Sequence, residues 1–201
     1  MKVLIACEFS GVVRREFAKL GHDTWSCDFL PADDNSPNHI QADVLTILDS
    51  GWDLMIAHPP CTYLSSSGLH WNKKDIKRAT KTLLSLAFVQ RLMNASIYRI
   101  AIENPIGCIS TQIRKPDQIV QPYQFGHNAS KATCLWLDNL PKLPIDQTLY
   151  VEPRIVNGKK RWDNQTDSGQ NRLPPSKDRW ALRSVTYQGI AEAMAKAWGI
   201  L

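Results

Sequence analysis

Short apolar runs alternate with segments of helical spacing along the first half of the chain. The first run, residues 2–7, is almost entirely apolar, as in a parallel strand that is covered on both faces. Val13, Phe17 and Leu20 then share one face of a predicted helix over residues 11–20. Similar runs predict the other strands at residues 23–27, 53–57, 98–102 and 133–137.

Two longer helices are expected farther along the chain. The first begins with Asn72 as its cap and Asp75 in its first turn, and it ends at about Met93. The residues that give it helical spacing are Ile76, Ala79, Leu83, Leu84, Ala87 and Leu92. The second is an amphipathic helix within residues 185–198. Its inward residues are expected to be Tyr187, Ile190, Ala191, Met194 and Trp198.

Alternating strands and helices predict an α/β fold, with a mostly parallel sheet and helices on both faces. The length fits a single domain over residues 1–201, with neither an internal repeat nor an interdomain linker. The pattern fails at about residues 138–183, where Pro, Asn, Lys and Arg are frequent. This segment is either a long functional insertion or partly ordered.

Composition and charge narrow the class of protein. No apolar run is long enough to span a bilayer and no secretory signal opens the chain, so we expect a cytoplasmic protein with neither a membrane nor an obligatory protein partner. The net charge of +5 and the pI of about 9.0 favour an anionic partner, most commonly nucleic acid. The five cysteines lack the close pairs of a zinc or redox site, and only Cys61 lies outside apolar segments. No metal is expected.

Polar side chains follow the ends of the predicted strands, where an open parallel sheet binds its ligands. A small-residue turn leads from the first strand into a helix whose N-terminus can face a ligand carboxylate. This turn contains Glu8, Phe9, Ser10 and Gly11. Asp28 is placed to accept ribose hydroxyls, and Asp43, after the short stretch 40–42, could receive an adenine amino group. Singly these residues are also typical of turns and caps, but together they are typical of a cradle for a nucleoside-type cofactor.

Two further strand ends carry reactive groups. Pro59 and Pro60 stiffen one turn and hold the next side chain, Cys61, at the mouth of the expected cleft. Glu103 directly follows the run at 98–102, and adjacent parallel strands would bring it near Cys61. Taken alone, an incidental thiol in a turn and a carboxylate that supports a helix cap remain alternatives.

The order of these motifs resembles the cytosine-C5 DNA methyltransferase family, in a compact, phage-like form. Its specific part is the pair Pro-Pro-Cys and Glu-Asn-Pro, and residues 123–137 and 187–190 are similar to later family motifs. The resemblance implies a Rossmann-like S-adenosylmethionine-dependent methyltransferase fold in a phage-infected or bacterial cell. Its implied cofactor site comprises Glu8, Phe9, Ser10, Gly11, Asp28, Asp43 and Pro59, and its implied substrate contacts are Pro60, Asn104, Thr133, Arg161 and Trp162.

The implied chemistry needs a thiol and a carboxyl group at one base. Carbon 5 of cytosine is a poor nucleophile, and addition of the Cys61 thiolate to carbon 6 makes it reactive toward a methyl donor. Glu103 is expected to be partly protonated and to hydrogen-bond ring nitrogen 3. Lys131 stands where the family has its first arginine and would bind the ring oxygen, while Thr133 stands in place of the second.

Family members that read DNA carry a large recognition region, for which only residues 138–183 are available here. Basic residues and an aromatic there could bind phosphates and stack a base, or could form a solvated basic loop. These residues are Arg154, Lys159, Lys160, Arg161, Trp162, Arg172, Lys177 and Arg179. Residues 62–68 are expected to close over a flipped-out cytosine. DNA is thus the expected partner.

Three alternatives stay open. A methyltransferase acting on adenine N6 or cytosine N4 would need an aromatic residue directly after the Pro-Pro turn, whereas Cys61 stands there and Tyr63 comes two residues later. The same carbon chemistry could act on RNA or on a free cytosine nucleotide. A non-catalytic descendant would only bind nucleic acid or cofactor, and it would need neither Cys61 nor Glu103.

Overall fold

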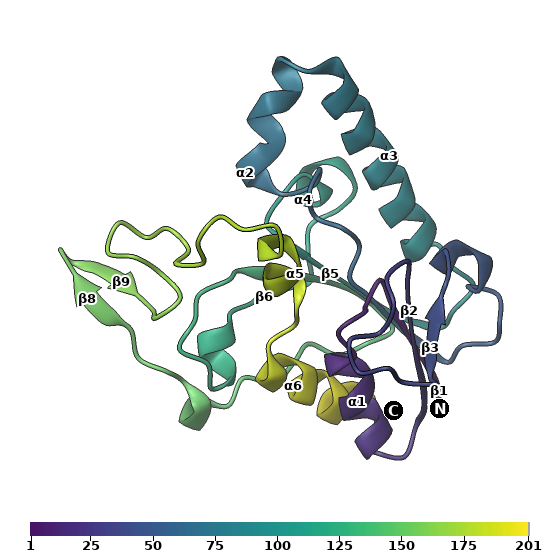
Figure 1. Ribbon diagram of the computed structural model, residues 1–201. Coiled ribbons are helices and arrows are strands. Elements are labelled where there is room, and N and C mark those ends of the chain that lie inside the picture. Colours follow the sequence, from purple (N-terminus) through teal and green to yellow (C-terminus); the bar gives the residue numbers. More distant parts are fainter. Residues whose placement is uncertain (201) are drawn as a thin grey trace.

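The computed structural model describes residues 1–200 and contains one seven-stranded sheet in the order β3-β2-β1-β4-β5-β7-β6 (Figure 1). The first five strands run parallel, whereas β7 is antiparallel to both β5 and β6. The strands are β1 (Lys2–Ala6), β2 (Asp23–Asp28), β3 (His39–Gln41), β4 (Leu54–Ala57), β5 (Arg99–Pro105), β6 (Gln118–Val120) and β7 (Thr133–Asp138). The predicted α/β class with a mostly parallel sheet is therefore confirmed.

Helices cover both faces of this sheet. On one face α1 (Val12–Lys19) and α6 (Gln188–Trp198) pack together, and on the other lies α3 (Ile76–Met93). The shorter helices are α2 (Ser66–Leu69), α4 (Ile109–Gln112) and α5 (Arg179–Ser184), with 3-10 turns η1 (Val44–Thr46), η2 (His70–Lys73), η3 (Pro122–Phe125) and η4 (Gln147–Leu149). Within residues 1–200, no helix combines the length and the apolarity needed to cross a membrane.

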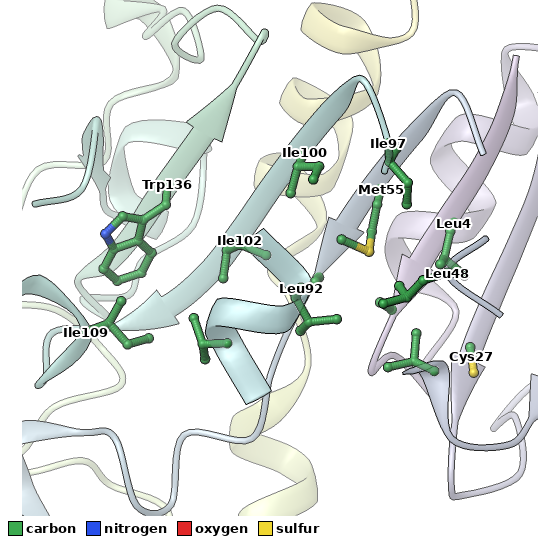
Figure 2. Packing of buried hydrophobic residues seen from close by; sticks show 14 of the residues in the cluster. Leu4, Cys27, Leu48, Met55, Leu92, Ile97, Ile100, Ile102, Ile109 and Trp136 are labelled. Atoms are coloured by element: carbon green, nitrogen blue, oxygen red, sulfur yellow. The ribbon is translucent and has the colours of Figure 1, made fainter. Parts of the chain in front are cut away.

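Alternate residues of β1 belong to two separate cores. Val3 and Ile5 pack with Phe17 and Trp198 beneath α1 and α6. Leu4 belongs to the core beneath α3, part of which Figure 2 shows. Because both faces of β1 are covered, every position from Val3 onward has to be apolar, which explains the continuous run in the sequence.

The apolar residues that gave α3 its helical spacing do not all lie on its buried face. Leu83 and Leu84 are 67% and 65% exposed, and the residues that α3 buries are Thr82, Leu86, Val89 and Leu92. The helix has apolar residues on more than one face, and one of its buried positions is a threonine, so helical spacing alone could not identify the core side. The cap is also different: the Asp75 side chain accepts the Arg78 N–H at 3.1 Å, and Asn72 lies outside the helix in η2.

Residues 138–183 contain regular secondary structure between their loops. They contain a hairpin of β8 (Arg154–Val156) and β9 (Lys159–Arg161), which extends from the body in Figure 1, followed by a loop and α5. Asn157 and Gly158 both have positive φ, the conformation that a tight two-residue hairpin turn requires.

Candidate catalytic site

Cys61 lies in a tight turn just beyond the carboxyl end of β4. Its carbonyl oxygen accepts the N–H groups of Leu64 and Ser65 at 3.0 and 2.9 Å. The turn is fixed to the next strand, because the Asn104 side chain donates to the carbonyl oxygen of Pro59 at 2.6 Å. As β4 and β5 are parallel neighbours, the residues that follow them emerge at the same edge of the sheet. Cys61 is exposed there.

Glu103 is held at this edge by a histidine. Nδ1 of His58 lies 2.9 Å from Oε2 of Glu103, and the two side chains are only 9% and 12% exposed. Burial by itself would raise the pKa of Glu103, but the hydrogen bond from His58 and the charges of Lys131 and His58 outweigh it and lower that pKa. The carboxyl group is thus ionised at neutral pH in the protein without a bound base, and its partial protonation beside a base stays a prediction.

The same carboxylate acts on the thiol. The pKa of Cys61 is raised, first because protein surrounds much of its sulfur although the residue reaches solvent, and second because Glu103 is negatively charged. The positive charges of Lys131 and Arg183 oppose this rise without cancelling it. Cys61 is therefore a protonated thiol at neutral pH, and removal of the charge on Glu103 would favour its thiolate.

Lys131 reaches the site from the segment that precedes β7. Its ammonium group donates to the carbonyl oxygen of Arg183 at 2.9 Å, which leaves two of its three donors available. Thr133 does not reach a ligand as expected, because it is only 4% exposed and its hydroxyl donates to the carbonyl oxygen of Lys131 at 3.1 Å. The role of Thr133 is to fix the backbone that carries Lys131.

A cavity of about 670 Å³ lies beside this site; Lys131 and Arg183 line it directly, whereas Cys61 and Glu103 contribute only through their chain neighbours. One wall comes from Ser65 and Ser66, which follow Cys61, and another from Pro105 and Ile106, which follow Glu103. The remaining lining includes Lys131, Asn164, Gln165, Asn171, Arg183 and Tyr187. Part of the segment that has no sequence period therefore encloses the candidate site.

The turn after β1 supports the first helix with its own side chains. The Glu8 carboxylate is 4% exposed and accepts the N–H groups of Val13 and Arg14 at 2.8 and 3.3 Å. The Ser10 hydroxyl lies 3.4 Å from the same carboxylate and 3.5 Å from the Val12 nitrogen. The expectation that this helix N-terminus faces a ligand carboxylate is therefore corrected, because its first N–H groups already have partners.

Gly11 and Phe9 show how closely other segments approach this turn. Gly11 has a φ of 67°, which disfavours any side chain, and an added Cβ would lie 2.5 Å from Nη2 of Arg14 and 2.8 Å from Oδ2 of Asp34, so the ends of these two side chains would have to move. The Phe9 ring faces Trp180 of α5, with ring centroids 6.1 Å apart. Helix α5 thus contacts the predicted cofactor turn through Trp180 and contacts Lys131 through Arg183.

Asp28 is the last residue of β2, and Asp43 lies two residues beyond the end of the neighbouring strand β3. Oδ1 of Asp28 accepts the Leu30 N–H at 2.9 Å, and Oδ1 of Asp43 accepts the Leu45 N–H at 3.0 Å. The second oxygen of each carboxylate has no hydrogen-bond partner among residues 1–200. Burial first, and then the charges of both aspartates, raise the pKa of the nearby Cys7 thiol. Two free acceptors therefore lie near one another at this edge.

Several predicted substrate contacts have other partners. Trp162 is 7% exposed, stacks on Tyr123 with centroids 4.2 Å apart, and donates to the Val151 carbonyl, so it cannot stack a base as expected. The Arg161 guanidinium binds carbonyl oxygens of its own hairpin and loop. Asn104 is 2% exposed and serves to fix Pro59, which is also buried. Pro60, beside Cys61, is exposed.

Two residues at the site were missed from the sequence. His58 precedes the Pro-Pro turn directly, so its position beside a predicted nucleophile was an available signal. Arg183 had no such signal, because it belongs to a segment without helical or strand spacing. Its approach to Lys131 and Cys61 depends entirely on how that segment folds back.

Similarity of this chain to known proteins is found in its structure rather than in its sequence. No protein-family model matches the chain, and no curated protein matches it. Among solved structures, the chain is similar to an E. coli protein that is encoded within a prophage and described as a DNA modification methyltransferase. The identity is 14% and the TM-score 0.48, and the match covers 78% of this chain and 53% of that one, so the chain spans about half its length. A similarity this distant carries no argument about activity.

Proposed function

We propose that this chain is an S-adenosylmethionine-dependent methyltransferase that methylates carbon 5 of cytosine in DNA, with Cys61 as the nucleophile. One observation carries the proposal: Cys61 and the buried, ionised Glu103 lie at the same edge of the sheet, close enough for the carboxylate to raise the thiol pKa. A thiol and a carboxyl group close to one another are what addition to a pyrimidine requires. A module that only binds nucleic acid has no use for either.

The residues present fit most of the proposed cofactor. The free oxygens of Asp28 and Asp43 suit the hydroxyl and amino donors of an adenosine group. The amino-acid end has to be held by groups other than the first N–H groups of α1, because Glu8 occupies them. When bound, S-adenosylmethionine supplies an electrophilic methyl group.

Glu103 can couple activation of the thiol to binding of the base. The carboxylate takes the Cys61 proton, so its negative charge is neutralised as the thiolate forms, and it gives this proton to ring nitrogen 3 and regains its charge as the thiolate adds to carbon 6. With carbon 5 methylated, its proton would be lost to solvent and the sulfur–carbon bond would break to release the thiolate, while the proton on ring nitrogen 3 would return through Glu103 to Cys61. Lys131, with two free donors, would stabilise charge on the ring oxygen.

His58 has a positioning role in this scheme. Its hydrogen bond orients Glu103 and favours the ionised carboxylate that accepts the thiol proton. Its other ring nitrogen, Nε2, is buried without a hydrogen-bond partner among residues 1–200. A buried donor or acceptor left in this state is destabilising, so a bound base or water that pairs with it would be favoured.

Incubation with S-adenosylmethionine carrying a tritiated methyl group tests this proposal. The protein is offered duplex DNA, single-stranded DNA, RNA and free dCMP in separate reactions, and the labelled nucleosides are separated. We expect label in 5-methylcytosine from DNA. Label at cytosine N4 or adenine N6 would contradict the carbon chemistry, label in RNA or dCMP alone would contradict the substrate, and no label in any pool would contradict the enzyme.

A further inference from the structure

A strongly basic surface lies at the junction of η2 and α3, outside the segment to which the sequence assigned phosphate contacts. We call it the lysine arm; it consists of Lys73, Lys74, Lys77 and Lys81. All four residues are exposed, and none forms an ion pair with a carboxylate in residues 1–200. The one acidic residue between positions 70 and 93 is Asp75, whose side chain caps α3.

This arrangement of charge is unfavourable for the isolated protein. The N-terminal end of a helix carries partial positive charge, so cations near the start of α3 are repelled by it. Lys77 and Lys81 are also one helical turn apart, a spacing at which like charges destabilise a helix by a few tenths of a kcal/mol. A bound polyanion would remove both penalties.

The lysine arm and the Cys61 loop are joined by hydrogen bonds. Arg78 donates to the carbonyl oxygens of Thr62 and Gly68 at 2.9 and 3.2 Å. The Thr82 hydroxyl donates to the carbonyl oxygen of Tyr63 at 3.0 Å. The Lys81 ammonium lies over the Tyr63 ring, 5.4 Å from its centroid. A ligand held by the arm is therefore held by the same unit that positions the nucleophile.

The arm and the β8–β9 hairpin extend from different sides of the body (Figure 1). The cavity is bordered by Ser65 and Ser66, which lie in the chain between Cys61 and the arm, and by Asn164 and Gln165, which follow the hairpin. Beside the arm, the Trp71 side chain is 53% exposed. The Lys74 ammonium lies over its ring, 5.7 Å from the ring centroid. Exposed cations with an exposed aromatic ring are the combination that binds a nucleic-acid backbone and stacks an unpaired base.

We infer that the lysine arm binds the phosphate backbone of the nucleic acid whose target base enters the Cys61 site. The inference rests on the proposed function for the identity of the target, but the arm's binding of nucleic acid can be measured separately. Lysine contacts to phosphate position a strand without reading its sequence, so the arm supplies affinity and register.

The test compares a variant in which the four arm lysines become glutamine with a control, Lys142→Gln together with Lys196→Gln. Both control lysines are exposed and lie at the end of α6 where Trp198 donates to the Pro141 carbonyl, far along the chain from the arm. Binding of a fluorescent DNA duplex and a single strand is measured from about 50 mM to about 200 mM salt. Methyl transfer, thermal unfolding and binding to vesicles of phosphatidylserine and phosphatidylcholine are measured in parallel.

We expect the slope of log affinity against log salt to become shallower in the arm variant, by about 0.9 for each lysine that contacts duplex phosphate, or about 0.7 on single strands. The loss of affinity should be equal for DNA of unrelated sequences. The melting temperature of the arm variant should not fall. If the arm variant and the control give the same slope, the inference about the arm is overturned, whereas the proposed methyl transfer is not affected by this result. Arm-dependent binding to vesicles with no change on DNA would overturn it as well. If DNA binding depends on the arm but no methyl transfer is detected, the inference about the arm is supported and the proposed chemistry is refuted.

Discussion

The charge of Glu103 connects three side chains of the candidate site. His58 and Lys131 favour the ionised carboxylate, and that carboxylate in turn disfavours the Cys61 thiolate. In the protein alone, the site is therefore set as a protonated thiol beside a charged acceptor. When a cytosine base binds, the proton of the Cys61 thiol can therefore move to the Glu103 carboxylate.

Replacement of His58 by glutamine should shift the pH dependence of methyl transfer. Glutamine can still donate a hydrogen bond, but it carries no charge, so the pKa of Glu103 should rise. Because Glu103 must be ionised to accept the thiol proton, the acidic limb of the rate profile should move to higher pH. The profile is measured as initial rate against pH, beside a thermal unfolding control. An unchanged acidic limb in a folded variant would contradict the role of His58.

At the scale of elements, α3 gives a matched pair of substitutions. Leu86 is 8% exposed and Leu83 is 67% exposed, on the same helix and with the same side chain. Leu86→Ala should lower the free energy of unfolding by about 2–5 kcal/mol, whereas Leu83→Ala should change it by less than about 0.5 kcal/mol. Urea unfolding of both variants measures the difference. Equal losses in the two variants would contradict the buried face of α3 described here.

The start of α6 should make stability depend on pH. Nε2 of His127 accepts the Gly189 N–H at 2.8 Å, so protonation breaks this bond, and burial lowers the pKa of His127 from its usual 6.5. The unfolded chain then takes up the proton first. The contribution of this hydrogen bond to the free energy of unfolding is complete above about pH 6.5. It is lost as the pH falls through the lowered pKa of His127 in the folded state. Urea unfolding should show this loss, and His127→Gln should remove it; a loss of equal size in that variant would assign it to other groups.

Element by element, the predictable part of the fold is the part with a strong period. Strands such as β1 and β4 are continuous apolar runs because both of their faces are covered. The edge strand β6 has only three residues, too few to show a pattern. The β8–β9 hairpin could have been found from Asn157 and Gly158, a typical turn pair between short strands.

At the scale of the whole molecule, the sheet brings distant residues to one edge. Cys61 and Glu103 were predictable as neighbours because Cys61 follows β4 and Glu103 lies in β5 directly after the last residue that pairs with β4. Arg183 and the cavity wall near Asn164 were not, because their segment has no period and its path depends on long-range contacts. Trp162 was assigned wrongly for a related reason: composition cannot distinguish an aromatic ring that stacks on Tyr123 from one that awaits a base.

The central claim is a covalent bond between Cys61 and the base, and trapping that bond tests it most directly. Release of the cysteine requires loss of the proton on carbon 5, so DNA with 5-fluorocytosine at the target should hold the protein once the methyl group has been transferred. The wild-type protein and Cys108→Ser, which alters a buried thiol, should gain the mass of the methylated oligonucleotide. Cys61→Ser should gain none. Methyl transfer by the wild type without any adduct, or an adduct that persists in Cys61→Ser, would contradict the account.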